Sequence, residues 1–347
     1  MSSKGSMAPI DFVITWVDGS DPELSVQRSS WKDLEPDTPW KEWTTGVKRY
    51  RDWGLLRYWF RAVDIYAPWV NHVYFVTAGS VPEWLEVNCS KLTVVKHEDF
   101  IPSKYLPTFN SHCIEWNLHR IKGLSEQFVY FNDDFYINAP VEADFFFESG
   151  LPKDYLALSV PKLHRKRTSY HVYSAMILND YWDMHEAVKR NPSKWFAPCY
   201  GPSIWARNLF LLSQKELPGF QCDHLPYSFL KSTFVKLWSI EYDELDRNCC
   251  DRFRGFYGIT PNLVRDWQRI EGSFMPRTTR HGKAFFDPDF FNHDENLGVL
   301  LEAINNMNYK VLCINDEIDD AEQYERWGDA VRAEFEKKLP SRSIYEK

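Results

Sequence analysis

Short and almost wholly apolar runs recur along the first half of this chain, and helix-like segments lie between them. Turn residues bound these runs, which lie at Phe12–Val17, Val73–Thr77, Leu92–Val95, Phe128–Phe131 and Leu156–Val160. A strand with one wet face would alternate polar and apolar residues, so continuous apolar runs predict parallel strands that are covered on both faces. Between the first two runs, Trp59, Phe60 and Val63 recur at helical spacing. This β-α-β order predicts an α/β fold with a mostly parallel sheet, whose ligands bind beyond the carboxyl ends of the strands.

The second half of the chain has a different pattern. From Pro161 onward, aromatic and helix-like segments are broken by several prolines, which predicts a helical insertion or lobe. The run Lys310–Ile314 then predicts a strand that returns to the sheet, and the charged segment Glu322–Lys338 predicts a terminal helix. We therefore divide the chain into an expression scar, an α/β core, a helical lobe and a returning strand with its helix, at residues 1–8, 9–160, 161–309 and 310–347.

Composition excludes several classes of protein. With 41 Lys and Arg against 49 Asp and Glu, the net charge is −8, whereas binding to duplex nucleic acid normally needs a basic excess. No apolar run approaches the roughly 20 residues of a membrane-spanning helix. Seven cysteines without a C-x-x-C pair favour a reducing, cytoplasmic location over a disulfide framework. Aromatic residues make up 16% of the chain, and such side chains suit the faces of sugars and nucleobases.

The first predicted strand ends in the sequence Asp18-Gly19-Ser20-Asp21-Pro22. A carboxylate and free backbone N–H groups at such a strand end are placed to hold a ribose or a diphosphate. The alternative is a simple Asp-Gly turn without a ligand.

Two further strand ends carry an Asn-Asp pair. Asn132-Asp133-Asp134 follows the strand at Phe128–Phe131, and Asn315-Asp316 follows the late strand. Adjacent carboxylates suit a hard divalent cation that shares its ligands with phosphates, and the two strand ends could face one ion. The alternatives are turns, helix caps and a solvated acidic loop.

A helix is predicted just before Asp133 and Asp134. Its apolar stripe of Ile114, Leu118 and Ile121, capped by Asn110 or Ser111, places Glu115 and His119 together on another face. A zinc pair is one interpretation, but the order does not match H-E-x-x-H. We expect Glu115 to point toward the two aspartates instead.

Three more segments carry polar groups of interest. His224 stands beside the rigid Pro226, and Arg254 offers a cation for phosphate, although a lone histidine is usually structural and an arginine usually lies on the surface. The basic run Lys162–Arg167 is a candidate contact for an anionic acceptor or a membrane surface, or else a solvated loop.

Four sequence blocks resemble the signature blocks of the Stealth family, in the same order. They are DFVITWVDGSDP (11–22), FNSHCIEWNLHRIKGLSEQFVYFNDD (109–134), HLPYSFLKS (224–232) and VLCINDEID (311–319). This family includes the catalytic subunit of N-acetylglucosamine-1-phosphotransferase and bacterial capsular polysaccharide phosphotransferases, and the compact length resembles the bacterial branch. One segment departs from the family pattern, because no acidic residues follow Arg254 in 255–260.

The resemblance implies a Rossmann-like, glycosyltransferase-A-like fold whose core binds a nucleotide sugar and whose helical lobe carries acceptor-side residues. It also implies transfer of a sugar 1-phosphate, such as an N-acetylhexosamine 1-phosphate, from a nucleotide-diphosphate sugar to a hydroxyl of a cell-surface polysaccharide. The nucleoside monophosphate is released, and Mg²⁺ or Mn²⁺ is the expected cofactor. We expect a UDP-linked donor, a polysaccharide or oligosaccharide acceptor, no nucleic acid, and a cytoplasmic enzyme with peripheral association at the membrane or with a capsule-assembly complex.

The resemblance and the strand ends together assign roles to individual residues. The catalytic candidates are His224, Glu115, Arg254, Asp134 and Asp316, with His224 or Glu115 as base for the acceptor hydroxyl. The donor-binding candidates are Trp16, Asp18, Gly19, Asp21, Arg57 and Asn110. The metal-binding candidates are Asp133, Asp134, Asn315 and Asp316.

Two other functions remain compatible with these features. An ordinary glycosyltransferase would share the sheet and the acidic strand ends, but it would cleave the bond between sugar and phosphate and release the nucleoside diphosphate. A carbohydrate-binding protein without activity would explain the aromatic residues but not the two Asn-Asp strand ends.

Overall fold

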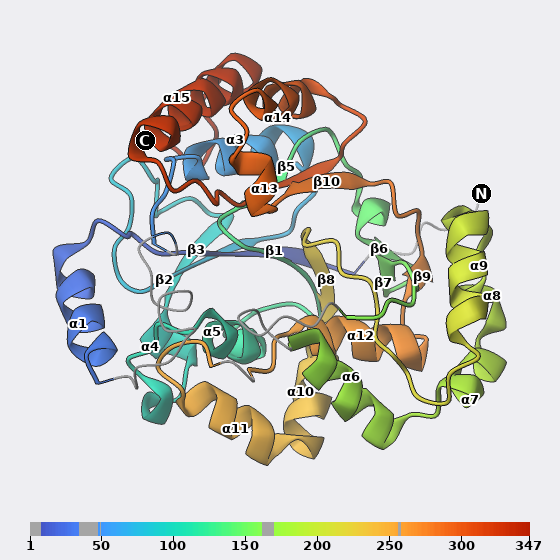
Figure 1. Cartoon of the computed structure of the whole chain (residues 1–347). Helices are drawn as coiled ribbons and strands as arrows, with labels where there is room; N and C mark the ends of the chain where they lie inside the picture. The colour runs from blue at the N-terminus through green and yellow to red at the C-terminus, as the bar shows by residue number, and fades with distance from the viewer. Residues whose placement is uncertain (1–7, 35–47, 49, 162–169, 256–257) are drawn as a thin grey trace, which may run out of the picture.

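The centre of the molecule is a five-stranded sheet in the order β3-β2-β1-β4-β8 (Figure 1). A computed structural model describes residues 8–34, 48, 50–161, 170–255 and 258–347. The strands are β1 (Ile10–Trp16), β2 (Val73–Thr77), β3 (Leu92–Lys96), β4 (Gln127–Phe131) and β8 (Tyr227–Leu230). The first four run parallel, and β8 pairs antiparallel with β4. The predicted α/β fold with a mostly parallel sheet is confirmed.

The middle of the sheet is buried because helices cover both faces. On β1, Phe12 pairs with Val73 on one side and with Val129 on the other, and all three side chains are fully buried. Figure 1 shows helices over both faces of the sheet. On one face are α3 (Leu56–Tyr66) and α15 (Ala321–Lys338), and on the other are α5 (Ser111–Asn117), α10 (Lys231–Ile240) and α12 (Asn262–Glu271). Both the predicted first helix and the predicted terminal helix are confirmed.

Other helices surround this core. In Figure 1, α1 lies at one end of the molecule, and α7, α8 and α9 lie at the other. Their bounds are α1 (Pro22–Lys32), α4 (His97–Phe100), α6 (Tyr170–Tyr181), α7 (Met184–Arg190), α8 (Pro192–Trp195), α9 (Pro202–Leu211), α11 (Tyr242–Cys250), α13 (Pro288–Phe291) and α14 (Asn296–Asn305).

The late strand does not return to the main sheet, contrary to our expectation. β11 (Val311–Ile314) lies between β10 (Gly282–Phe285) and β5 (Phe135–Ile137) in a separate three-stranded sheet. The chain turns after β4 and continues as β5, which leaves the main sheet. β11 pairs antiparallel with β5 and not with a strand of the main sheet. This pairing places the two predicted Asn-Asp strand ends side by side.

The prediction of a strand at Leu156–Val160 is wrong. The strand in this region is β7 (Leu151–Asp154), which pairs with β6 (Phe147–Glu148) and β9 (Met275–Pro276). Leu158 is fully buried, but its backbone N–H donates to the Asn208 side chain at 2.8 Å and its strand pairing is a single bridge. An apolar run can therefore be buried by packing without joining a ladder.

The segment predicted as a helical lobe needs one correction. Residues 161–309 contain α6 to α14, but also β8, β9 and β10. β8 is a four-residue edge strand that alternates buried and half-buried side chains, a signal too short to stand out among the prolines around it.

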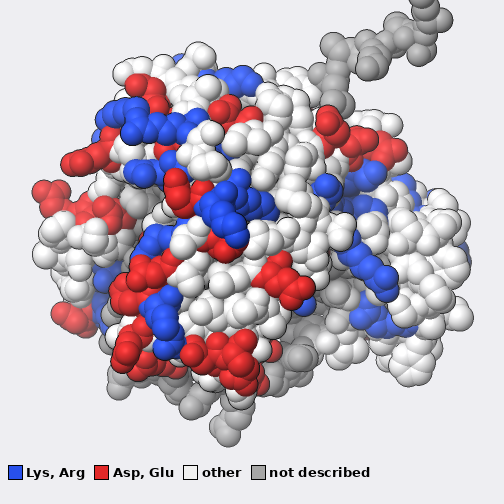
Figure 2. Space-filling view, turned by 90° about the horizontal axis from the view of Figure 1, so that it is seen from above, with Lys and Arg blue, Asp and Glu red and all other residues white. Residues whose placement is uncertain are grey.

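Two of the predicted features lie outside the described residues. They are residues 1–7 of the predicted scar and the basic run Lys162–Arg167. The face seen in Figure 2 carries Lys and Arg side chains interspersed with Asp and Glu, without a broad basic area. Among the helices of the described chain, none combines the length and the apolar character needed to span a bilayer.

Candidate active site

A cavity of about 280 Å³ opens at the carboxyl ends of β1 and β4. The strand order reverses direction between these two strands, and open α/β sheets bind their ligands at such a point. The wall residues come from the strand ends, from residues 48, 50–53 and 55 before α3, from α5, and from the loops around His224 and Arg254. The side chains with polar groups that line it include Thr15, Trp16, Lys48, Tyr50, Arg51, Asp52, His97, Thr108, Ser111, Asn132, Asp133, Asp134, Tyr136, His224, Arg254, Asn315 and Asp316.

Asp133 and Asp134 lie in the turn between β4 and β5, where they face the cavity together. The backbone oxygen of Asp134 accepts a hydrogen bond from Ile314 at 2.9 Å, so β11 fixes the position of this turn. Burial of the Asp133 carboxylate raises its pKa, and the negative charges of Asp134 and Asp52 raise it further. Three carboxylates thus crowd one side of the cavity, an arrangement that a bound cation would stabilise.

Asp134 has the donor atoms of a metal ligand. Its Oδ1 is buried without a hydrogen-bond partner among the described residues. Its Oδ2 lies 3.4 Å from the Cys313 thiol and 3.5 Å from Nε2 of His224. The possible ligand atoms of Asp134, His224 and Cys313 lie within 4.8 Å of one another. Among these atoms the carboxylate oxygens suit a hard cation, so the unpartnered Oδ1 of Asp134 and the adjacent Asp133 carboxylate fit a metal ion at this point.

His224 adopts an unusual backbone conformation, with φ at 45°. A left-handed conformation is strained for a residue other than glycine, and such strain is concentrated at functional sites. The ring packs edge-on against Phe135 at 5.0 Å and Phe286 at 5.7 Å between centroids. This packing directs Nε2 toward Asp134, so the histidine is held in the cavity wall.

Glu115 lies behind the wall of the cavity on α5, which Asn110 caps through its side-chain oxygen. Burial raises the pKa of Glu115 to about 7, against the opposing effects of Arg254 and the Ser111 hydroxyl. Arg254 donates to this hydroxyl at 2.6 Å. Glu115, Ser111 and Arg254 thus form one polar group beside Asp134 and His224.

The structure also argues against the alternative of a zinc pair at Glu115 and His119. The helix tightens to a 3₁₀ turn at Leu118, so the i,i+4 spacing no longer aligns Glu115 with His119. His119 is instead buried against Phe234 and Trp238, and its Nδ1 lies 3.1 Å from the backbone oxygen of Trp116.

The sequence reasoning missed Arg51, the cation that pairs with Asp316. Its Nε donates to Asp316 Oδ2 at 2.8 Å, and its Nη2 contacts Oδ1. Oδ1 also accepts from the Ile318 backbone at 3.1 Å, so both oxygens of Asp316 are engaged by protein groups. The one available signal was the concentration of basic residues in 48–51.

Of the six donor-binding candidates, Trp16 is the one that lines the cavity. Its indole donates to Asp52 at 3.0 Å, whereas Asp18 closes a turn by accepting from Ser20. At Gly19, a side chain would overlap the backbone oxygen of Tyr50, so only glycine allows this approach.

The other three candidates, like Asp18 and Gly19, are not among the cavity-lining residues. Asp21 caps α1 and also accepts from the Ser80 hydroxyl. Arg57 lies over Trp84 and 3.5 Å from Glu346, and Asn110 is a buried helix cap. Their sequence positions were adjacent to the motifs, but their side chains serve the scaffold.

Two solved structures are distantly similar to this chain. A galactosyltransferase LgtC, solved with donor and acceptor sugar analogues, is 9% identical and matches with a TM-score of 0.38 over 93% of this chain and 95% of its own. Mouse xyloside xylosyltransferase 1 is 12% identical, with a TM-score of 0.36 over 89% of this chain and 98% of its own. At TM-scores below 0.5, neither match is evidence for an activity of this chain.

Sequence relatives are much closer and span the whole chain. A capsular polysaccharide phosphotransferase WcwK of Streptococcus pneumoniae is 39% identical over 99% of both chains. A receptor polysaccharide phosphotransferase WefC of Streptococcus oralis is 38% identical over 98% of this chain and 100% of its own. An exopolysaccharide phosphotransferase cps2G of Lactiplantibacillus plantarum is 36% identical over 97% and 96%.

Two conserved regions of one family match in addition. Stealth protein CR1, conserved region 1, matches residues 8–32, and Stealth protein CR2, conserved region 2, matches residues 49–154. They contain the first two sequence blocks, and they supply the ends of β1 and β4 that form the cavity. Together with full-length relatives at 36–39% identity, these matches show that the chain belongs to the Stealth protein family.

Proposed function

We propose that this protein transfers a sugar 1-phosphate from a nucleotide-diphosphate sugar to a hydroxyl of a capsular or other cell-surface polysaccharide. The names of the full-length relatives support a polysaccharide phosphotransferase. The observation that carries the proposal is a cavity in which carboxylates and guanidinium groups stand together: Asp133 and Asp134 with Arg51 and Arg254. A diphosphate with its counter-cation needs both kinds of group.

In the proposed reaction, the acceptor oxygen attacks the phosphorus that carries the sugar. The bond from this phosphorus to the oxygen of the nucleotide's own phosphate breaks, and the nucleoside monophosphate leaves with that oxygen. The bond between the sugar and its phosphate stays intact, and the acceptor proton passes to a base on the protein. In phosphoryl transfer, catalysis comes mainly from positioning and from charge stabilisation.

The carboxylate side of the cavity is suited to Mg²⁺ or Mn²⁺. We assign the ion to Asp133 and Asp134, with the Asn315 side chain as a further oxygen donor, because hard cations prefer oxygen. Cys313 is a soft ligand, and its thiol contacts Asp134, so we assign it a supporting contact. When bound, the ion supplies charge stabilisation to the phosphate oxygens. Asp316 is better explained as the partner that orients Arg51.

Arg51 and Arg254 are placed to bind the diphosphate. Arg254 keeps a position beside Ser111, and Arg51 is fixed by its two contacts with Asp316. A guanidinium group that is already oriented loses little freedom when it binds phosphate.

Of His224 and Glu115, His224 is the better candidate for the base that removes the proton from the acceptor hydroxyl. Its imidazole lines the cavity next to Asp134, whereas Glu115 lies behind the wall. Glu115 interacts electrostatically with both Arg254 and His224. We therefore assign it two roles: it stabilises the charge of Arg254, and it stabilises the proton that His224 takes up during the reaction.

A UDP-linked donor, a cytoplasmic location and a peripheral association with the membrane complete the proposal. The relatives' polysaccharide products support an acceptor made of sugar units, and the aromatic content of 16% suits sugar binding.

The test is to incubate the protein with a panel of nucleotide sugars, Mg²⁺ and an oligosaccharide acceptor, and to identify the released nucleotide. With a UDP-sugar, we expect UMP and an acceptor that carries a phosphodiester. Stoichiometric UDP would instead show an ordinary glycosyltransferase. Binding of the acceptor without turnover of any donor would support the carbohydrate-binding alternative.

A further inference from the structure

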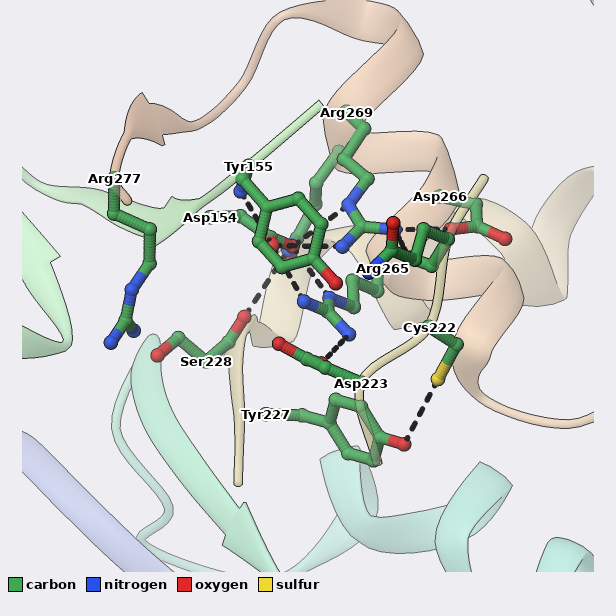
Figure 3. Close-up of polar contacts among 12 residues, drawn as sticks. Asp154, Tyr155, Cys222, Asp223, Tyr227, Ser228, Arg265, Asp266, Arg269 and Arg277 are labelled. Carbon is green, nitrogen blue, oxygen red and sulfur yellow. Dashed lines mark hydrogen bonds and ion pairs between the residues drawn. The ribbon is translucent and has the colours of Figure 1, made fainter. Parts of the chain in front are cut away.

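A buried cluster of charged side chains contacts Asp223, the residue before His224 (Figure 3). Asp154, at the end of β7, accepts hydrogen bonds from Arg265 at 2.7 and 2.7 Å and from Arg269 at 3.0 and 2.9 Å. The three side chains are 8%, 7% and 1% exposed. Although burial opposes it, the two arginines hold the pKa of Asp154 below its ordinary value. Buried ion clusters are weak sources of stability, so this one calls for another explanation.

Each arginine has a further donor that reaches the segment before His224. Nη1 of Arg265 donates to Asp223 Oδ1 at 2.8 Å, and Nη1 of Arg269 donates to the backbone oxygen of Gln221 at 3.1 Å. Asn262, on the same helix, lies 3.6 Å from the thiol of Cys222.

These contacts come from one face of α12. Asn262, Arg265 and Arg269 are spaced by three and four residues, which places them along one side of the helix. Asp154 accepts two hydrogen bonds from each guanidinium group and so fixes both. α12 therefore contacts each of residues 221–223, up to the residue immediately before His224. Two other segments contact them as well: the Gln221 backbone N–H donates to the Ala157 oxygen at 2.8 Å, and Nε2 of His281 lies 3.3 Å from Asp223 Oδ2.

His224 itself cannot relax into an ordinary conformation without moving this segment. Its φ of 45° is a strained value for a residue with a side chain, and such strain persists only where the surrounding structure enforces it. Asp223 is anchored on one side of His224, and the Leu225 side chain that follows is buried.

We propose that Arg265 and Arg269 are positioning residues that hold His224 in its reactive orientation, acting through Asp223 and the Gln221 backbone. The inference rests on the proposed function, because it takes His224 as the group that contacts the acceptor hydroxyl. Asp154 is then the shared counter-ion that fixes the two arginines. None of these three residues lines the cavity, so they act on the reaction through the orientation of His224.

The experiment severs the link and leaves the cluster in place. Asp223→Ala removes the contacts of Asp223 with Arg265 and with His281, while Asp154 keeps both of its arginines. Because a misplaced catalytic group costs on the order of 10²-fold, we expect kcat to fall by about that factor, with the donor KM within about twofold of wild type. Asp223→Asn keeps an oxygen that accepts from Arg265, and it should restore most of the turnover.

The matched control is Glu346→Ala. Glu346 also forms a buried ion pair, with Arg61 at 2.9 Å, and the two side chains are 3% and 5% exposed, but neither lines the cavity. This variant should lose a comparable amount of thermal stability and keep the wild-type kcat. A loss of turnover in Glu346→Ala that matches that of Asp223→Ala would show a general effect of stability and overturn the proposal.

A second readout does not depend on turnover. In protein labelled at its histidine rings, the NMR signal of His224 is identified by its loss in His224→Asn. The signal should shift or broaden in Asp223→Ala and stay unchanged in Glu346→Ala. If wild-type protein transfers no sugar phosphate, the proposed function fails, yet this signal still tests whether α12 holds His224.

A folded Asp223→Ala protein with an unchanged His224 signal and an unchanged kcat would overturn the inference. If Asp223→Ala does not fold, Arg265→Lys replaces it, because lysine keeps a charge beside Asp154 without a planar fork that also reaches Asp223. The His224 signal and kcat of Arg265→Lys then test the inference in the same way: a change in both supports it, and no change in either overturns it.

Discussion

Nε2 of His224 lies 3.5 Å from Oδ2 of Asp134, although the two residues belong to motifs that are far apart in the sequence. The turn after β4 presents Asp134, and the strained loop before β8 presents His224. Because β4 and β8 are neighbours in the sheet, their connections meet at the cavity. The proposed metal ligand and the proposed base are thus brought together by the antiparallel edge of the main sheet.

The first prediction separates catalysis by His224 from its structural role. His224→Asn removes the imidazole but places at this position a residue that tolerates a left-handed backbone. A general base contributes about 10²- to 10⁴-fold, so kcat should fall by at least about a hundredfold while thermal stability and donor binding stay near wild type. Steady-state kinetics and thermal melts check this. Normal transfer by the folded variant would leave Glu115 as the candidate base.

The second prediction concerns the cation. Removal of divalent ions with a chelator should abolish transfer, and Mg²⁺ or Mn²⁺ should restore it. Asp134→Asn keeps the side-chain volume but loses a charge and a ligand oxygen, so it should lose most turnover and require more Mn²⁺ for half-maximal activity. Titration calorimetry with Mn²⁺ measures the binding directly. Full activity in excess chelator would reject the metal role.

The third prediction concerns the pair of Arg51 and Asp316. Arg51→Lys keeps the charge but loses the planar fork, so we expect donor KM to rise by about tenfold or more with a smaller change in kcat. Asp316→Asn should have an effect in the same direction, because Arg51 would no longer be oriented. The double variant should be little worse than either single one, as expected for residues that act as a unit. Strictly additive losses would show that the two residues act separately.

The fourth prediction concerns stability at acid pH. Burial lowers the pKa of His97, His119 and His281 to about 4 each. These folded values lie below the unfolded value of about 6.5, so the unfolded chain binds more protons as pH falls. The resulting stability is fully present above about pH 6.5 and is lost between about pH 6.5 and 4.

His119 provides the variant for this test, because it lies away from the cavity and stacks on Phe234. His119→Phe keeps an aromatic ring that cannot be protonated. Urea unfolding at pH 7.5 and 5 should show a smaller acid-induced loss in the variant, by on the order of 1 kcal/mol. An equal loss in both proteins would show that His119 does not contribute to the acid sensitivity.

Local sequence patterns were sufficient for the elements whose side chains are buried by their immediate surroundings. β2 was predicted with its correct bounds and β4 to within one residue, and the residues at helical spacing between the first two strands lie in α3. Continuous apolar runs and helical periodicity are local consequences of burial, on both faces of a strand and on one face of a helix. The pattern failed at Leu158, where an equally apolar run is buried by packing and bonds to a side chain.

The sequence by itself determined that acidic groups follow strands, that Asp134 and His224 belong to family motifs, and that an α/β sheet would present them. Only the tertiary structure decided which polar groups meet. Arg51 joins the site because it pairs with Asp316, while Arg57, six residues later, pairs with Glu346 away from the cavity. Likewise, Arg265 reaches Asp223 from a helix that carries no recognisable motif. Periodicity reports how each segment is buried, whereas partners from distant segments are set by strand order and helix packing, which a local pattern does not contain.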